Sequence, residues 1–324
     1  MPTTLADKET MVCGACKIKC QRFGKHRNGL QRFRCPECKA TFTEEHHNVL
    51  GGMTIPMDKA LLALQLLIEG NSIRSTQRIT NLDQNTIIKL LVIAGEKCER
   101  IMAKHVRNIA VQDVECDEIW AYVGKKEGHK TEAEANDGSL GDAYCFVAIE
   151  RNTKLVLNFA LGRRNQQTTD AFIEGLRDTV KPGHRFQITT DGFVPYISAI
   201  TTTLGHTVDF ARLIKVYAAG TEGEGRYSPA QVQSTEVVPV IGNPDPARIC
   251  TSIVERQNLT IRMSMRRLTR LTKAFSKKFE NLWAAYCLHF AYYNFCRVHR
   301  TIRVTPAMEA GIADHIWDLA ELLR

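Results

Sequence analysis

Two pairs of cysteines near the N-terminus constrain the fold of this chain more than any other feature. Each pair has the spacing Cys-x-x-Cys, and 18 residues separate the pairs. Four thiolates on two such knuckles form a tetrahedral shell, the coordination that structural zinc prefers. We therefore predict a zinc ribbon over residues 1–50 with one structural Zn2+, and Cys20 and His26 remain alternative ligands. The predicted ligands are Cys13, Cys16, Cys35 and Cys38.

Basic side chains are concentrated around these cysteines. Between Lys17 and Lys39 there are eight Lys or Arg residues and one acidic residue, Glu37. Such a block suits a polyanion such as DNA or RNA, and a solvated basic surface is the alternative interpretation. The predicted DNA contacts in this part of the chain are Arg22, Lys25, Arg27, Arg32 and Arg34.

The whole sequence is that of a soluble protein with more than one domain. It has 324 residues, 44% of them hydrophobic and 24% charged, with a formal net charge of +8. No stretch resembles a signal peptide, and none approaches the ~20 apolar residues of a membrane helix. We expect a cytoplasmic, nucleoid-associated protein without a membrane partner, in which clustered cysteines bind metal rather than form disulfides.

Residues 51–105 are predicted to form a helix-turn-helix domain. Asp58 and Ser72 are candidate caps for two helices, and Asp83 follows a turn and is placed to cap a third. A short helix, a tight turn and a longer helix are typical of that motif. The helix from Gln84 to about Lys97 would enter the major groove, and packing against a partner subunit is the alternative. The residues expected to contact bases or phosphates are Gln84, Asn85 and Lys89.

Residues 106–324 have the pattern of an α/β domain. Three strands are followed by helix, strand, helix, strand and a closing helical part, which is the element order of a ribonuclease-H-like fold. Strands are expected at 111–123, 144–150, 154–161, 185–190 and 206–210. The first two helices are expected at 168–180 and 196–204. We interpret 212–247, with eight Gly or Pro, as an insertion, and expect helix from 249 to about 296 and a basic C-terminal part.

Three acidic residues fit one cleft of this fold. Asp117 lies in the first strand, Asp191 directly follows the fourth, and Glu255 begins the long helix. Neighbouring first and fourth strands would bring these carboxylates together, where they repel each other unless divalent cations lie between them. Two such ions can activate the attacking and stabilise the leaving oxygen of a phosphoryl transfer. The acids Asp113, Glu115 and Glu118 are alternatives to Asp117, and we expect Glu118 on the opposite strand face.

The segments around these acids resemble the D-D-E motifs of the insertion-sequence-1 family of transposases. They are Asp117-Glu118-Ile119-Trp120, Thr190-Asp191-Gly192-Phe193 and Val254-Glu255-Arg256-Gln257-Asn258. The cysteine pairs, the helix-turn-helix pattern and the tail with His299-Arg300 and Thr305-Pro306 are also similar to that family. The resemblance covers nearly the whole chain, although the 63 residues between Asp191 and Glu255 make a long interval.

The resemblance implies a transposase. Such an enzyme binds the terminal inverted repeats of an insertion sequence, cleaves the DNA ends and joins the 3′ ends to target DNA. We expect two Mg2+ (or Mn2+) ions per active site on Asp117, Asp191 and Glu255, and a homo-oligomer in the DNA complex. The same helix face as Glu255 carries Asn258, Arg262 and Arg266, which are predicted to grip the DNA end. The alternatives are a DNA-binding regulator without activity and a ribonuclease-H-like nuclease without strand joining.

Overall fold

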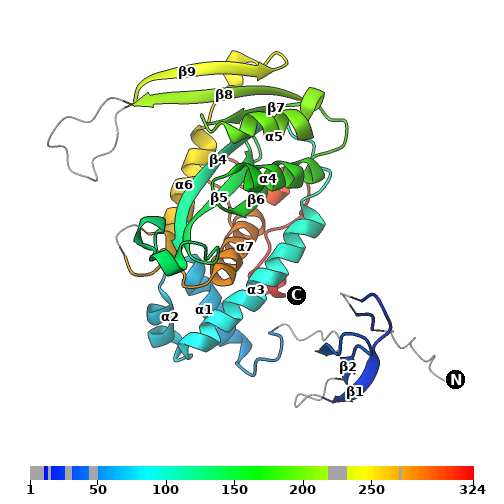
Figure 1. Cartoon of the computed structure of the whole chain (residues 1–324). Helices are drawn as coiled ribbons and strands as arrows, with labels where there is room; N and C mark the ends of the chain where they lie inside the picture. Colours follow the sequence, from blue (N-terminus) through cyan, green and yellow to red (C-terminus); the bar gives the residue numbers. More distant parts are fainter. Residues whose placement is uncertain (1–10, 14–15, 26–30, 44–49, 218–231, 270–271) are drawn as a thin grey trace. The chain divides into compact units, whose positions relative to one another are not determined.

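The chain forms two compact units that divide between Thr54 and Ile55. The computed structural model describes residues 11–13, 16–25, 31–43, 50–217, 232–269 and 272–324, and the fold is given for these (Figure 1). None of the helices in these ranges has the length and apolar character needed to cross a bilayer.

The N-terminal unit contains a small antiparallel sheet. Its strands are β1 (Gln21–Lys25), β2 (Gln31–Arg34) and β3 (Thr41–Thr43), in the order β1-β2-β3. Three buried cysteines form its centre, and Phe33 and Phe42 pack against them. The described part of this core is small, and small modules with such a core commonly depend on a metal.

The second unit begins with three helices: α1 (Met57–Ile68), α2 (Ile73–Thr80) and α3 (Gln84–His105). Two of the three expected caps are confirmed, because Ser72 accepts a hydrogen bond from the Ser75 amide at 3.0 Å and Asp83 from the Asn85 amide at 2.8 Å. Asp58 is not a cap, since α1 begins one residue earlier, after Pro56, which already fixes the backbone dihedral φ.

A six-stranded mixed sheet follows, in the order β6-β5-β4-β7-β8-β9 (Figure 1). β4 pairs antiparallel with β5 and β5 with β6, whereas β4, β7 and β8 are parallel. The first and fourth strands of this sheet in chain order, β4 and β7, are therefore neighbours, as predicted. The bounds are β4 (Asp113–Val123), β5 (Gly141–Glu150), β6 (Val156–Gly162), β7 (Phe186–Thr190), β8 (Val208–Tyr217) and β9 (Val232–Ile241).

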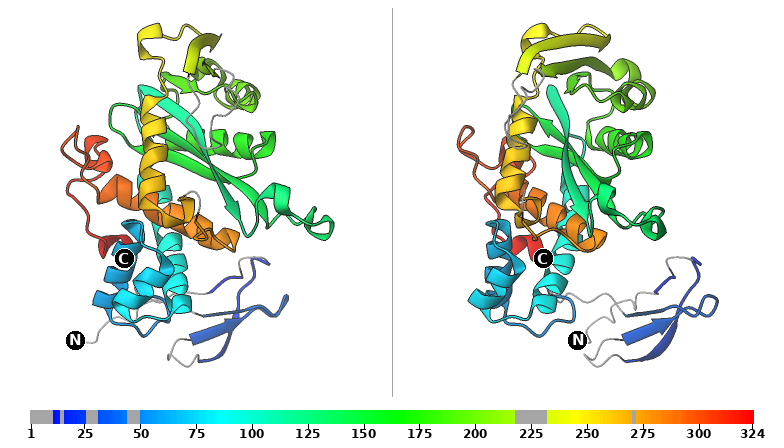
Figure 2. Two further views of the ribbon diagram at one scale, coloured as in Figure 1. Left: turned by 90° about the vertical axis from the view of Figure 1, so that its left-hand side faces the viewer. Right: turned by 60° about the vertical axis from the view of Figure 1, so that its left-hand side comes forward.

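Helices cover both faces of this sheet. α4 and α5 lie on one face, and α6 runs along the other (Figure 2). The bounds are α4 (Gln166–Thr179), α5 (Pro195–Thr203), α6 (Ser252–Ser264), α7 (Phe279–Phe295) and α8 (Pro306–Glu309). Short 3-10 turns occupy Glu127–His129, Glu132–Glu134, Gly205–Thr207, Pro246–Arg248, Arg266–Leu268 and Glu321–Leu323.

The helix α7 joins the helical and sheet parts of the second unit. It packs along α3 so closely that a Cβ atom on Gly95 would lie 2.5 Å from the Ala284 Cα, so glycine is required there. The buried Asn294 amide donates to the Val156 carbonyl and accepts from its N–H, which attaches α7 to β6. Helices α1–α3 and the sheet thus share one compact unit, and the three-part domain division stays a prediction.

Two element predictions differ from the structure. The strand expected at 206–210 extends to Tyr217 as β8, and β9 pairs antiparallel with it inside 212–247, whose interpretation as an insertion stays a prediction. The backbone pairing with β8 explains this strand, since its own side chains are almost all exposed. The helix expected from 249 to about 296 is also interrupted: residues 265–278 separate α6 from α7.

Candidate active site

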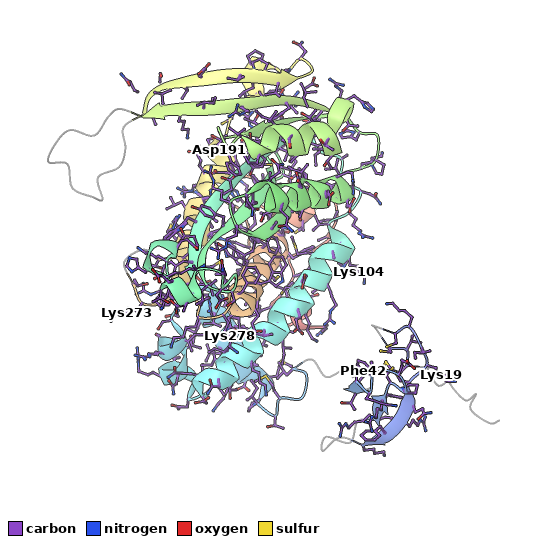
Figure 3. The ribbon with its side chains drawn as sticks, viewed as in Figure 1. Lys19, Phe42, Lys104, Asp191, Lys273 and Lys278 are labelled. Carbon is purple, nitrogen blue, oxygen red and sulfur yellow. The ribbon has the colours of Figure 1, made fainter. Side chains whose placement is uncertain are left out.

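Two neighbouring parallel strands place the first two predicted carboxylates side by side. Cys116 of β4 is in register with Thr190 of β7. The residues that come next in the chain, Asp117 and Asp191, therefore lie side by side. Figure 3 shows Asp191 at the sheet end next to α5 and α6. The parallel pairing explains why two acids 74 residues apart in the chain meet at one point.

A third carboxylate, that of Glu118, joins them. Three carboxylate oxygens, one from each residue, lie within 4.8 Å of one another. They belong to Asp117, Glu118 and Asp191. The expected alternation along β4 holds, because Asp117 contacts Asn258 on α6 whereas Glu118 contacts Arg164 before α4. The longer side chain nevertheless brings the Glu118 carboxylate into the group, which the alternation alone did not predict.

The crowding of acids raises two pKa values. Burial, followed by repulsion from Asp191 and Glu118, raises the pKa of Asp117 to about 7. Burial and repulsion from Asp191 also raise the pKa of Glu118 to about 7. One buried Glu118 oxygen has no hydrogen-bond partner among the described residues. Buried, mutually repelling oxygen ligands of this kind fit a hard divalent cation, which would relieve both penalties.

The other two acids of β4 have structural partners. Asp113 pairs with Arg248 at 2.5 Å. Glu115 is buried and accepts hydrogen bonds from the N–H groups of Ile253 and Val254, at 2.8 and 3.0 Å. A carboxylate at the start of a helix satisfies free N–H groups and suits the helix dipole. These contacts favour Asp117 as the first catalytic carboxylate, which stays a prediction.

Glu255 lies at the same cavity but outside the three-acid group. Its carboxylate accepts a hydrogen bond from the Thr251 hydroxyl at 2.6 Å and forms an ion pair with Lys215 of β8. The cavity measures about 690 Å3, and Asp117, Asp191 and Glu255 all line it. The three acids predicted from the sequence therefore face one space, and Lys215 holds Glu255 in the arrangement described.

Arg164 is a site residue that the sequence interpretation missed. Its guanidinium lies 3.1 Å from a Glu118 oxygen and 3.5 Å from an Asp191 oxygen. It also covers the ring of Phe193, at 4.0 Å from the ring centroid. Its position directly before the cap Asn165 of α4 marks it only as the start of a helix, so the sequence contained no signal for this role.

The helix α6 carries two of the three residues predicted to grip the DNA end, and their contact with DNA stays a prediction. The Asn258 amide donates to Asp117 at 2.8 Å, so this residue contacts the acid rather than free solvent. Arg262 lies near the end of α6, and its guanidinium is 3.4 Å from the Leu268 carbonyl. Arg266 is not on the Glu255 face, because α6 ends at Ser264 and Arg266 opens a separate 3-10 turn.

The three residues of α3 that are predicted to contact bases or phosphates differ in their surroundings. Asn85 and Lys89 are exposed, whereas the Gln84 amide donates to Gln77 of α2 at 2.8 Å. Gln84 and Asn85 line the same cavity as Arg266, although that arginine is far away in the sequence. Their contact with DNA stays a prediction.

The predicted zinc ligands converge in the N-terminal unit. Four sulfur atoms lie within 4.8 Å of one another, which is compatible with a metal site. They belong to Cys13, Cys16, Cys35 and Cys38. Without metal, a hydrogen bond with Cys38 is the main cause that raises the pKa of Cys16 to about 12. Cys20 is buried beside the group but is not part of it.

Basic residues border this cluster as expected. Arg22 and Lys25 are exposed on β1, and the guanidinium groups of Arg32 and Arg34 lie over the Phe23 ring at 5.6 and 5.0 Å. Phe23 itself is 43% exposed, so it belongs to the surface rather than to the small core. The predicted contact Arg27 and the alternative ligand His26 lie outside the described residues.

Comparison with known proteins gives remote structural likenesses. No protein-family description matches the sequence, and no curated protein matches it. The chain is similar to a piggyBac transposase in a synaptic complex with hairpin DNA, at 10% identity and a TM-score of 0.39, covering 82% of this chain and 69% of that one. It is also similar to a Mos1 strand transfer complex, at 11% identity and a TM-score of 0.21, covering 45% and 56%. At these values the likeness is remote, and the case for a function rests on the site.

Proposed function

We propose that this protein is a DDE-type DNA transposase with a ribonuclease-H-like catalytic part. It would bind the terminal inverted repeats of an insertion sequence, cleave the element ends and join the 3′ ends to target DNA. The observation that carries the proposal is the gathering of Asp117, Glu118 and Asp191 within 4.8 Å, with Glu255 facing the same cavity. The motif resemblance to the insertion-sequence-1 family supports the same assignment.

The carboxylates fit Mg2+ or Mn2+. Asp117, Asp191 and Glu255 would hold two ions, and Glu118 adds a buried oxygen without a partner. When bound, such cations supply activation of a nucleophilic oxygen and stabilisation of the leaving 3′ oxygen. Because the raised pKa of Asp117 lies near neutral pH, a cation bound there would compete with the proton of this carboxylate.

The chain's own residues prepare the site for a DNA strand. Asn258 orients the Asp117 carboxylate, and Glu115 fixes the start of α6 so that Glu255 faces the cavity. Arg164 and Lys215 are the cations beside the acids, and both line the cavity. With their charge neutralised by bound cations, the carboxylates would leave these two side chains available to phosphate groups of a strand in the cavity.

DNA binding is proposed for three parts of the chain. They are the basic strands of the proposed zinc ribbon, the proposed helix-turn-helix of α2 and α3, and the basic run from Arg256 to Lys278. The affinity of these three parts for DNA would come mainly from contacts with phosphates. The loss of one carboxylate should therefore leave the DNA affinity nearly unchanged. Catalysis at two element ends and a target also suggests a homo-oligomer in the DNA complex.

The proposal is tested by cleavage of a labelled DNA end taken from the sequence that flanks the coding region. We expect Asp117→Asn, Asp191→Asn and Glu255→Gln to abolish cleavage and joining with Mg2+ or Mn2+ and to keep DNA binding. Asp113→Asn and Glu115→Gln are the controls from the same strand, and both should retain cleavage. Glu118→Gln decides whether the fourth acid contributes. If all six variants cut equally, the protein is not this enzyme, and binding without cleavage by the unchanged protein indicates a regulator.

A further inference from the structure

A second cavity lies away from the carboxylates, where α2 and α3 begin. It measures about 630 Å3 and is enclosed by the N-terminal ends of these helices, the segment after α6 and one side of α7. Figure 3 shows Lys273, a lining residue, at the end of this unit where α1 and α2 lie, whereas Lys104 lies near the other end of α3. The catalytic residues already described do not line it.

The lining is strongly basic. It contains five Lys or Arg residues and no acidic residue: Arg74, Arg266, Arg267, Lys273 and Lys277. The start of α2, which is capped by the neutral Ser72 side chain, adds the positive end of a helix dipole, whereas the Asp83 carboxylate already caps the start of α3. An anion is the ligand that such a surface favours, and a phosphate group matches both the guanidinium groups and the start of α2.

Arg267 gives the clearest indication of an absent anion. One nitrogen of its guanidinium donates to the Ser276 hydroxyl at 2.8 Å, and another is buried without a partner among the described residues. Burial lowers the pKa of Arg267 to about 10, and no neighbouring carboxylate opposes that effect. Arg267 is half-buried, and its buried nitrogen is costly without a counter-ion, so an anion bound in this cavity would relieve that cost.

The rest of the cavity is suited to a flat heterocycle. Phe275 and Leu288 provide apolar walls, while His289 and Asn281 provide polar groups. Both polar residues are buried, and each has one side-chain atom without a partner among the described residues, the His289 Nε2 and the Asn281 Oδ1. Burial lowers the pKa of His289 to about 3, so the imidazole is neutral and offers both a donor and an acceptor.

We propose that this cavity binds one nucleotide of a DNA strand, with its phosphate at Arg266, Arg267 and Lys273 and its base against Phe275, facing His289 and Asn281. The proposal rests on the proposed function, because the strand would belong to the DNA on which the enzyme acts. A strand suits the surroundings better than a free nucleotide, since the eight Lys or Arg residues from Arg256 to Lys278 have no acid among them and continue beyond the cavity.

The experiment uses the full chain as the Asp117→Asn variant, which keeps the DNA uncut. Fluorescence anisotropy compares a labelled deoxythymidine strand of about five nucleotides with an abasic strand of equal length. We expect the strand with bases to bind about tenfold more tightly, because stacking of one base contributes roughly that factor. Deoxythymidine monophosphate and inorganic phosphate serve as competitors, and competition by the nucleotide as strong as that by the strand would indicate a free-nucleotide site instead.

Variants separate the base from the phosphate. His289→Leu should remove most of the base preference while keeping or raising the melting temperature, because it replaces an unpaired buried polar group by an apolar one. Phe275→Ala, at a half-buried position, tests the same preference if His289→Leu does not fold. Lys273→Ala should weaken the binding of both strands equally. It should also reduce the slope of log affinity against log salt concentration by about one, as expected for the loss of one phosphate contact. The matched control Lys104→Ala should change neither the affinity nor the slope.

Three further results would overturn the proposal. The first is equal affinity for the strand with bases and the abasic strand when the cavity is unchanged. The second is a preference for the strand with bases that survives both His289→Leu and Phe275→Ala. The third is a loss of affinity in Lys104→Ala as large as that in Lys273→Ala. Metal-dependent cleavage by the chain with Asp117 restored would then show that only the nucleotide site is wrong. Absence of that cleavage would instead contradict the proposed enzyme.

Discussion

At the scale of single residues, the candidate site is unfavourable to the fold of the metal-free protein. Asp117, Glu118 and Asp191 are held close together, two of them largely buried, and repulsion accompanies desolvation. Side chains that are poorly placed for stability and well placed for ligand binding are a common sign of a functional site. The predicted consequences concern stability, pH and competition between cations.

The first prediction is that Asp117→Asn stabilises the metal-free protein at pH 8. The folded pKa of about 7 lies above the ordinary carboxyl value of 3.8, so the folded state holds a proton that the unfolded state has lost. The free energy of unfolding therefore falls as pH rises from about 4 to about 7 and stays low above that. We expect the melting temperature of the variant to exceed that of the unchanged protein by a few degrees at pH 8 and by less at pH 5.

The control is Asp113→Asn on the same strand. Asp113 is paired with Arg248, so its loss should lower the melting temperature rather than raise it. Thermal unfolding in the presence of a chelator measures both variants. A stability loss in Asp117→Asn at pH 8 would mean that its hydrogen bonds with Asn258 and the Glu118 amide outweigh the repulsion.

The second prediction concerns Arg164, which lies between Glu118 and Asp191 as a cation does. Arg164→Ala should raise the affinity of the DNA-free protein for Mn2+ a few-fold, since the arginine no longer competes for the carboxylates. The expected size is small because the Arg164 side chain is 38% exposed and solvent screens the pairs. The same variant should weaken DNA binding, because a phosphate-binding cation is lost.

Arg163→Ala is the matched control for this prediction. Arg163 precedes Arg164 directly, yet it pairs with Glu127 at 2.6 Å, away from the three acids. Calorimetric titration with Mn2+ should therefore find its affinity unchanged. A lower Mn2+ affinity in Arg164→Ala would show that this arginine holds the carboxylates in the metal-binding arrangement instead of competing with the metal.

At the scale of elements, the position of α6 depends on β4. The Glu115 carboxylate bonds two N–H groups at the start of α6, and Asn258, one turn after Glu255, bonds Asp117 of the same strand. β4 thus fixes both the beginning and the middle of the helix. The Glu255 carboxylate faces the cavity because the helix is attached in this register.

The third prediction follows from that attachment. Glu115→Ala should lower the free energy of unfolding by about 2 kcal/mol or more, because two N–H groups lose a buried charged acceptor. It should also reduce cleavage, since α6 no longer presents Glu255 in a fixed position. Glu115→Gln keeps one acceptor oxygen and should retain most of both properties. Denaturant unfolding and the cleavage assay measure the two effects, and loss of cleavage in Glu115→Gln with full stability would make Glu115 itself a catalytic candidate.

Much of the element order could be predicted from the sequence. Alternating and apolar runs located β4 to β7, and cap residues such as Ser72 and Asp83 fixed helix starts, because both signals are local. β9 could not be predicted, since its side chains are mostly exposed and only its backbone pairing with β8 defines it. The break after Ser264 has no proline or glycine to mark it.

The candidate site was predictable only where motif and topology agree. Asp117 lies in β4 and Asp191 directly follows the adjacent parallel strand β7, so the strand order alone brings them together. Arg164 and Lys215 could not be found in the same way, because each is a single basic residue whose neighbour is set by side-chain packing over long sequence separations. The participation of Glu118 likewise depends on side-chain length rather than on strand alternation.

At the scale of the whole molecule, the two compact units differ in what stabilises them. The unit from Ile55 onward has a large core of buried side chains from the sheet and from α3 and α7. The described residues of the N-terminal unit form three short strands and a centre made chiefly of cysteines. Binding of metal by four thiolates can supply ~10–16 kcal/mol, which is then folding free energy of that unit alone.

The last prediction is therefore that zinc removal unfolds one unit and spares the other. Metal analysis should find one zinc per chain, and a strong chelator should expose the amides of the described residues from Met11 to Thr43 to hydrogen exchange, with those of Ile55–Leu323 still protected. Cys35→Ser should behave like the chelated protein and weaken DNA binding, because the basic strands β1 and β2 lose their fixed arrangement. Cys20→Ser is the matched control, since Cys20 is buried beside the cluster but outside the four-sulfur group. Retention of zinc by Cys35→Ser together with its loss from Cys20→Ser would show that the ligand assignment is wrong, and equal exposure of both units would show that they do not fold independently.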